Sequence, residues 1–128
     1  MKKIVLLMGT FYGATAVILG AFGAHAFKKI LPAEKLISFE TGVKYQMYHA
    51  LLLVALGLFL NFQSGLEKGA GWTLIIGTLL FSFSIYFLSF AEHWGVNLKW
   101  LGPITPLGGL SLIIGWFLLL FHFMKMKQ

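Results

Sequence analysis

The chain alternates between long apolar stretches and short polar segments. The apolar stretches cover residues 4–24, 45–62, 72–91 and 104–124. A helix of about 20 apolar residues crosses the roughly 30 Å hydrocarbon core of a bilayer. The pattern therefore predicts an all-α integral membrane protein, a four-helix bundle that forms a single transmembrane domain over residues 1–128.

The first apolar stretch has an alternative interpretation as a secretory signal. Lys2 and Lys3 precede it, and Ala24-His25-Ala26 fits the small-x-small pattern of a cleavage site. The apolar core is longer than that of a typical signal and contains several glycines. We therefore favour a retained membrane span.

The polar segment between the first two stretches has a helical period of its own. Apolar residues recur at Leu36, Phe39, Val43 and Met47. Charged and hydroxyl side chains occupy the opposite side, and Pro32 suits a first helical turn. We expect a short interfacial amphipathic helix between spans one and two, which bends or runs directly into the second span.

Lysine dominates the charged residues of the chain. Its ten basic residues are all lysines, and four acids oppose them, which gives a net charge of +6. On a membrane protein such an excess faces anionic lipid headgroups, and we expect this contact for Lys28, Lys29 and Lys35. Five lysines lie on each side of the predicted membrane, so their count does not fix the orientation. The first span, which often dominates insertion, favours both termini in the cytoplasm.

The composition also excludes some chemistry. Without cysteine the chain has no disulfide and no thiolate site. Nucleic acid is not an expected partner, because the aromatic residues lie within apolar stretches rather than on a basic face. The expected partners are membrane lipids, with a second copy of the chain or another protein as further possibilities.

Most of the polar residues other than lysine gather at one predicted end of the bundle. Four spans place the end of span one, the start of span two, the end of span three and the start of span four on the same side. The candidate ligand-binding residues there are His25, Glu40, Tyr45, Gln46, His49, Tyr86 and Glu92. We expect His25 and His49 at matched depth, where two imidazoles are costly unless they pair or bind something.

Two further strips of residues follow helical spacing, a polar strip on the third span and a strip of small residues on the first span. The polar strip contains Thr78, Ser82, Tyr86, Ser89 and His93. We interpret its hydroxyl groups first as packing contacts between helices and second as a polar path through the membrane.

A strip of small residues on the first span contains Gly9, Gly13, Ala16, Gly20 and Ala24. Such a strip allows two helices to approach closely. We favour a contact inside the molecule over a dimer interface, because four short helices need internal contacts first.

The fourth span has a marked start. Thr105 followed by Pro106 predicts an N-cap and the first helical position. Gly108 and Gly109 leave the first turn bare, so that another backbone or a ligand can approach it.

At these residues the sequence resembles the family of small four-span membrane proteins of the YgdD/YwdK type. The resemblance covers essentially the whole chain and rests on "GAFGAH" (20–25), "YQMYHALLL" (45–53), "FSFSIYFL" (81–88) and "GPITPLGGL" (102–110). Ala26 and Phe83 stand where the family commonly has glycine. The resemblance implies a multi-pass cell-membrane protein of no established activity, and it supplies no catalytic residues.

No pattern in the chain indicates an enzyme. It lacks a Gly-x-Ser-x-Gly elbow, paired carboxylates and a His-Glu-x-x-His motif. Two histidines with Glu40 or Glu92 could ligate zinc, so a metal site stays open, and no cofactor is expected. The favoured function is non-enzymatic binding of a small ligand, a lipid headgroup or a partner protein at the polar end. The alternative is a transporter-like or proton- or metal-conducting protein that uses the strip from Thr78 to His93.

Overall fold

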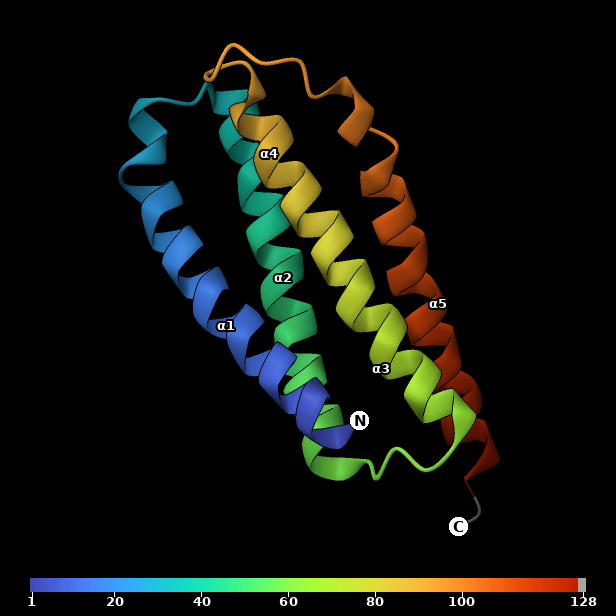
Figure 1. The fold of residues 1–128 in the computed structure, drawn as a ribbon. Helices are drawn as coiled ribbons and strands as arrows, with labels where there is room; N and C mark the ends of the chain where they lie inside the picture. The colour runs from blue at the N-terminus through green and yellow to red at the C-terminus, as the bar shows by residue number, and fades with distance from the viewer. Residues whose placement is uncertain (127–128) are drawn as a thin grey trace.

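Four long helices form the molecule, which is described over residues 1–126 by a computed structural model (Figure 1). Each is long and apolar enough to cross a membrane, and the third is continuous from α3 through η2 to α4. The start of α1 and the end of α5 lie at the same end of the molecule, as an even number of spans predicts (Figure 1). In chain order the elements are α1 (Lys2–Ala24), the 3-10 turn η1 (Phe27–Lys29), α2 (Ala33–Phe59), α3 (Gly65–Thr78), the π-helical turn η2 (Leu79–Phe83), α4 (Ser84–Ala91), the 3-10 turn η3 (Lys99–Leu101) and α5 (Ile104–Lys125).

The predicted interfacial helix between spans one and two is not a separate element. Its residues form the first half of α2, a single helix that begins at Ala33 and ends at Phe59, rather than a span over 45–62. Residues 33–59 contain no proline, so the helical hydrogen bonds of α2 continue without a break. The apolar period of this segment comes from packing inside the bundle rather than from contact with the membrane surface. Phe39, which belongs to the period, is buried against the other helices, whereas Ile37, which does not, is exposed.

The small residues of α1 pack against α2 inside the molecule, as predicted. A Cβ atom at Gly9 would lie 2.9 Å from the backbone nitrogen of Val54. Farther along α1, Gly13 lies opposite Ala50, Gly20 opposite Val43 and Gly23 opposite Phe39. These contacts set the antiparallel register of the two helices.

Glycines also bring α5 close to the third long helix. A Cβ atom at Gly108 would lie 2.8 Å from the Cα atom of Phe81, and one at Gly77 would lie 2.9 Å from the backbone nitrogen of Leu112. Ser111 adds a hydrogen bond of 2.8 Å from its Oγ atom to the carbonyl oxygen of Thr73. The prediction that another backbone approaches the first turn of this span closely is therefore confirmed.

The start of α5 differs from the prediction. The helix begins at Ile104, with Pro103 at the cap, so Thr105 and Pro106 lie within its first turn. The Thr105 hydroxyl does not cap the helix but lies 2.7 Å from the Ser84 hydroxyl. Pro106 fits at this place because the first helical N–H groups have no partner within the helix.

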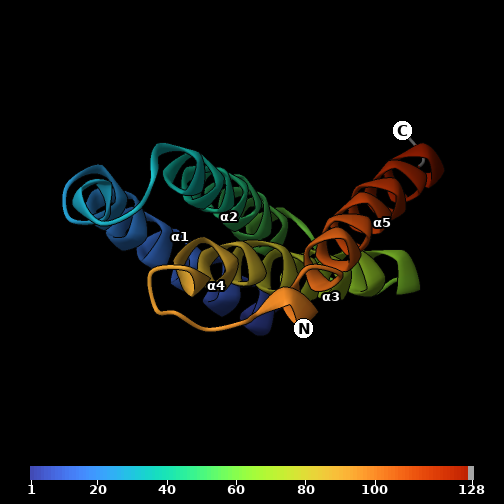
Figure 2. The same cartoon turned by 90° about the horizontal axis from the view of Figure 1, so that it is seen from above.

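The backbone of α5 has close neighbours on one side only. Within residues 1–126 it packs against α3, η2, α4 and η3, while its backbone makes no close approach to α1 or α2. Seen from above, α2 and α5 lie apart on the same side of the third long helix (Figure 2). This arrangement leaves a space between α2 and α5, with η2 and α4 as its floor.

Candidate functional site

A groove lies between α2 and α5, about halfway along the helices. It has a volume of about 310 Å³. We call it the α2–α5 groove, and its lining residues are Tyr45, His49, Phe81, Gly109, Leu112, Ile113 and Trp116. The imidazole of His49 is its most polar group, and aliphatic and aromatic side chains form most of the rest.

His49 is the buried histidine of this groove. Only 5% of it is exposed. Its Nδ1 atom lies 2.7 Å from the carbonyl oxygen of Tyr45, and its Nε2 atom lies 3.2 Å from the indole nitrogen of Trp116. Because a carbonyl only accepts and an indole N–H only donates, Nδ1 carries the proton and Nε2 accepts. The geometry therefore fits a neutral imidazole with both nitrogens in use.

The contact between His49 and Trp116 links the two walls of the groove. Across residues 1–126 it is the only hydrogen bond between α2 and α5. Since the backbones of these helices stay apart, this pair limits how far the groove can open at this depth.

The prediction that His25 and His49 lie at matched depth is wrong. His49 precedes Ala50, which lies opposite Gly13, whereas His25 lies two residues beyond Gly23. At about 1.5 Å per residue, the two histidines are therefore roughly 16 Å apart along the helix direction. His25 is exposed at the end of α1, while His49 lies near the middle of the bundle.

Gln46 and Tyr86 belong to a buried network that joins three helices. The Gln46 Nε2 atom donates to the carbonyl oxygen of Tyr12 at 2.9 Å and to the Thr15 hydroxyl at 2.7 Å. The Tyr86 hydroxyl donates to Gln46 Oε1 at 2.6 Å, and the Tyr12 hydroxyl donates to the carbonyl oxygen of Ile75 at 2.9 Å. This network satisfies the polar groups of Gln46 internally, which is the arrangement of a structural contact.

The polar strip of the third long helix also makes internal contacts. Thr78 donates to the carbonyl oxygen of Leu74 in its own helix, and Ser82 donates to that of Gly42 on α2. Ser89 donates to the carbonyl oxygen of Ile85 in its own helix, and His93 is exposed beyond the end of α4. Three of the hydroxyl groups in the strip thus donate to backbone carbonyl oxygens, which is the arrangement of structural contacts.

A second hollow lies between the α2–α5 groove and the end of the bundle where α2 begins. This hollow of about 170 Å³ is lined by Lys35, Ser38, Ile85, Leu88, Ser89 and Thr105. Ile85 is one turn beyond Phe81 on the groove floor, and Thr105 is one turn before Gly109 on α5. This hollow therefore follows the α2–α5 groove along the same two walls.

A wider hollow opens at the end of the bundle, and we call it the groove mouth. It has a volume of about 580 Å³ and is lined by Lys35, Leu88, Ala91, Glu92, Gly95, Val96, Asn97, Leu98 and Lys99. It shares Lys35 and Leu88 with the hollow below it. Glu92 thus lines the same hollow as Lys35 and Lys99, and neither lysine forms an ion pair within residues 1–126.

The remaining predicted site residues lie outside these hollows. Glu40 is exposed on α2, and Lys28 and Lys29 are exposed on η1. The structure therefore separates the predicted site into the groove, the buried network of Gln46, and the exposed end of α1. No group of three or more possible metal-ligating side chains occurs in the described part of the chain.

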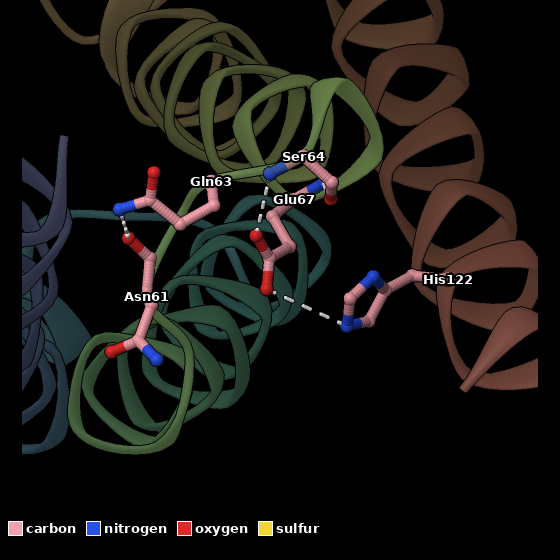
Figure 3. Close-up of polar contacts among 5 residues, drawn as sticks. All are labelled: Asn61, Gln63, Ser64, Glu67 and His122. Carbon is pink, nitrogen blue, oxygen red and sulfur yellow. Dashed lines mark hydrogen bonds and ion pairs between the residues drawn. The ribbon is translucent and has the colours of Figure 1, made fainter. Parts of the chain in front are cut away.

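An ion pair at the opposite end of the molecule was not predicted (Figure 3). His122 Nε2 lies 3.6 Å from Glu67 Oε1, and Glu67 is only 7% exposed. The other carboxylate oxygen of Glu67 accepts a hydrogen bond of 2.9 Å from the backbone nitrogen of Ser64. The spacing of Ser64 and Glu67 is that of a capping box, and this pattern in the sequence could have revealed an ordered carboxylate there.

Removing the imidazole of His122 should weaken the contact between the end of α5 and the start of α3. We expect His122→Ala to lower the free energy of unfolding by about 0.5–1 kcal/mol, as for other partly exposed ion pairs. Thermal unfolding in detergent micelles measures the change. Lys125→Ala, in the same exposed turn, should have a smaller effect, and an equal effect of both variants would contradict a specific pair.

Comparison with known proteins finds membrane proteins that match nearly the whole chain. The UPF0382 membrane protein YwdK of Bacillus subtilis is 40% identical over 119 residues, which cover 91% of this chain and 93% of that protein. The UPF0382 inner membrane protein YgdD of Escherichia coli is 33% identical over an alignment of 130 residues, gaps included, that covers 99% of this chain and 94% of that protein. No solved structure matches the chain. Residues 19–109 match the family model described as "Protein of unknown function (DUF423)", and the chain belongs to this family of multi-pass membrane proteins.

Proposed function

We propose that this chain is a non-enzymatic membrane protein that holds one lipid molecule in the α2–α5 groove. The observation that carries the proposal is a row of three hollows along α2, from the groove mouth through the hollow at Ser38 to the groove at the buried pair of His49 and Trp116. Ligand sites in membrane bundles are commonly apolar hollows between helices with few polar groups. A lipid chain would fill the apolar part, and the His49–Trp116 pair would form its inner end.

The dimensions of the groove favour a lipid over a helix of another protein. A helix with its side chains is about 10–12 Å across, whereas the groove near His49 holds about 310 Å³. That volume admits a hydrocarbon chain lying along the helices. The path from Lys35 to His49 on α2 is roughly 21 Å long at 1.5 Å per residue, which is about half of the 40–45 Å thickness of a bilayer with its headgroups. One lipid in one leaflet fits this length.

Gly109 lines the groove without a side chain, so the groove is open at this position. A Cβ atom there would lie 3.6 Å from the nearest atom of the Phe81 ring, which is ordinary contact. Larger side chains at this position would extend into the groove without displacing the backbone. The sequence "GG" at 108–109 therefore combines two roles, with Gly108 for close packing and Gly109 for open space.

We expect Gly109→Leu to remove the bound lipid while the protein stays folded. The leucine side chain would occupy the volume beside Phe81 that the lipid chain needs. Native mass spectrometry of protein purified in mild detergent measures the lipid retained per chain, and thermal unfolding reports the folded state.

Gly65→Leu is the matched control, because a Cβ atom at Gly65 has no neighbour within 4 Å. It should retain the lipid as the unaltered protein does. Equal lipid retention in the unaltered chain and in Gly109→Leu would contradict the proposal.

The transporter-like alternative has less support than lipid binding. It needs a polar path, whereas the hydroxyl groups of Thr78 and Ser89 donate to carbonyl oxygens of their own helix. Proton flux into proteoliposomes tests it directly. A flux that disappears in His49→Ala would favour this alternative over a lipid-holding role.

A further inference from the structure

We propose that the lipid in the α2–α5 groove is anionic, and that Lys35 and Lys99 bind its phosphate at the groove mouth. This inference rests on the proposed function, and it names the chemical class of the ligand. It assigns a role to Lys99, which comes from the loop before α5 and is far from Lys35 in the sequence.

The charges at the groove mouth favour an anion. Lys35 and Lys99 both line the hollow, and Glu92 is the only acid that lines it. Two lysines against one carboxylate leave a net positive charge, and neither lysine is neutralised by an ion pair within the described residues. Lysine is a common phosphate ligand that acts as a compact charge. Glu92 would accept hydrogen bonds from the hydroxyl groups of a glycerol headgroup beside the phosphate.

The position of Lys35 connects the charged mouth with the apolar groove. Lys35 is partly buried, and it lines both the mouth and the hollow below it together with Leu88. A phosphate held by Lys35 would therefore place the attached chain over Ile85, in the direction of His49. The head site and the chain site therefore follow one another along α2.

The lysines of η1 provide a contrast within the same end of the molecule. Lys28 and Lys29 are exposed and line neither the mouth nor the groove. They can attract an anionic membrane surface, as lysines near a membrane generally do. They do not lie beside the path of a lipid bound between α2 and α5, so their loss should leave the choice of the bound lipid unchanged.

The experiment offers the full-length protein equal amounts of phosphatidylglycerol and phosphatidylcholine in nanodiscs or mixed micelles. Native mass spectrometry then measures which lipid stays bound to the unaltered chain, to Lys35→Gln with Lys99→Gln, and to Lys28→Gln with Lys29→Gln. Both double variants remove the same charge. Thermal unfolding checks that each remains folded.

We expect the unaltered chain to retain phosphatidylglycerol in preference to phosphatidylcholine. The Lys35 and Lys99 variant should lose on the order of tenfold in this preference, since a lysine near anionic lipid contributes roughly fivefold or less, and it should still retain one lipid. The Lys28 and Lys29 variant should keep the preference. No preference in the unaltered chain, or an equal loss in both double variants, would overturn the anionic site.

The outcomes separate this inference from the proposed function. If the unaltered chain retains a lipid that Gly109→Leu loses, but without preference for charge, the groove binds lipid and the anionic site is wrong. If Gly109→Leu retains as much lipid as the unaltered chain, the groove itself is not the binding place, and both proposals fail.

Discussion

Gly108→Ala should destabilise the protein by about 2–3 kcal/mol, although alanine is normally the better helix former. At an unconstrained helical site, the exchange of glycine for alanine gains roughly 0.5–1 kcal/mol. At Gly108 the added Cβ atom would lie 2.8 Å from the Cα atom of Phe81 and 2.9 Å from the carbonyl carbon of Leu80. These atoms belong to the backbone of η2 and cannot rotate away. Helix α5 would have to move off the third long helix, and overpacking of this kind typically costs 1–3 kcal/mol.

The neighbouring glycine gives a control of the same chemistry. A Cβ atom at Gly109 would lie 3.6 and 3.7 Å from two ring atoms of Phe81, so Gly109→Ala should leave stability unchanged or raise it slightly. Thermal unfolding of both variants in the same detergent compares them directly. A similar change in both would show that the close approach of Gly108 to η2 does not limit the packing of α5.

The four spans could be predicted because their signal is local. Each apolar stretch carries its own length and composition, and glycines spaced along one helical face indicate a close neighbour whichever helix that is. The strip from Gly9 to Gly20 and the close approach at Gly108 were correctly predicted for this reason. The π-helical turn at Leu79–Phe83 has no comparable signal, since its residues also suit a regular helix.

The depth of His49 could not be predicted from composition alone. The polar residues before Tyr45 made the first half of α2 resemble an interfacial segment, which placed His49 near the membrane surface. In the structure these residues already belong to the long helix, so His49 lies deeper and His25 stays at the end of α1. The position of a residue within a bundle depends on the register between helices, which is set by contacts distant in the sequence.

Only part of the candidate site was predicted, because its residues are brought together by the same contacts between helices. Tyr45 and His49 do line the groove, but Trp116 of α5, which also lines it, and Lys99, which lines the groove mouth, were not among the predicted site residues. Tyr12 was also missed, although a tyrosine inside an apolar helix needs a hydrogen-bond partner when it is buried. Its position in the first apolar stretch was the available signal.

Gln46→Leu should be the most damaging single change in the buried network, with a loss of about 2 kcal/mol. Leucine keeps most of the volume but removes the two hydrogen bonds donated by Nε2 and the one accepted by Oε1. Hydrogen bonds between membrane helices average about 0.6 kcal/mol each, and the Tyr86 hydroxyl would in addition lose its buried partner. We expect a lower midpoint of thermal unfolding, since α1 and α4 would lose a common contact on α2.

Tyr86→Phe distinguishes the lost hydrogen bonds from a packing defect. In Gln46→Leu alone, the buried Tyr86 hydroxyl is left without its partner, whereas in the double variant this hydroxyl is absent. The double variant should therefore lose less stability than the sum of the losses of the two single variants. Thr10→Val is a suitable control, because the Thr10 hydroxyl donates only to the carbonyl oxygens of Leu6 and Leu7 in its own exposed turn. Strict additivity of Gln46→Leu and Tyr86→Phe would mean that their contact of 2.6 Å does not couple the helices, and the stability of the bundle would then rest on its glycine contacts and apolar packing.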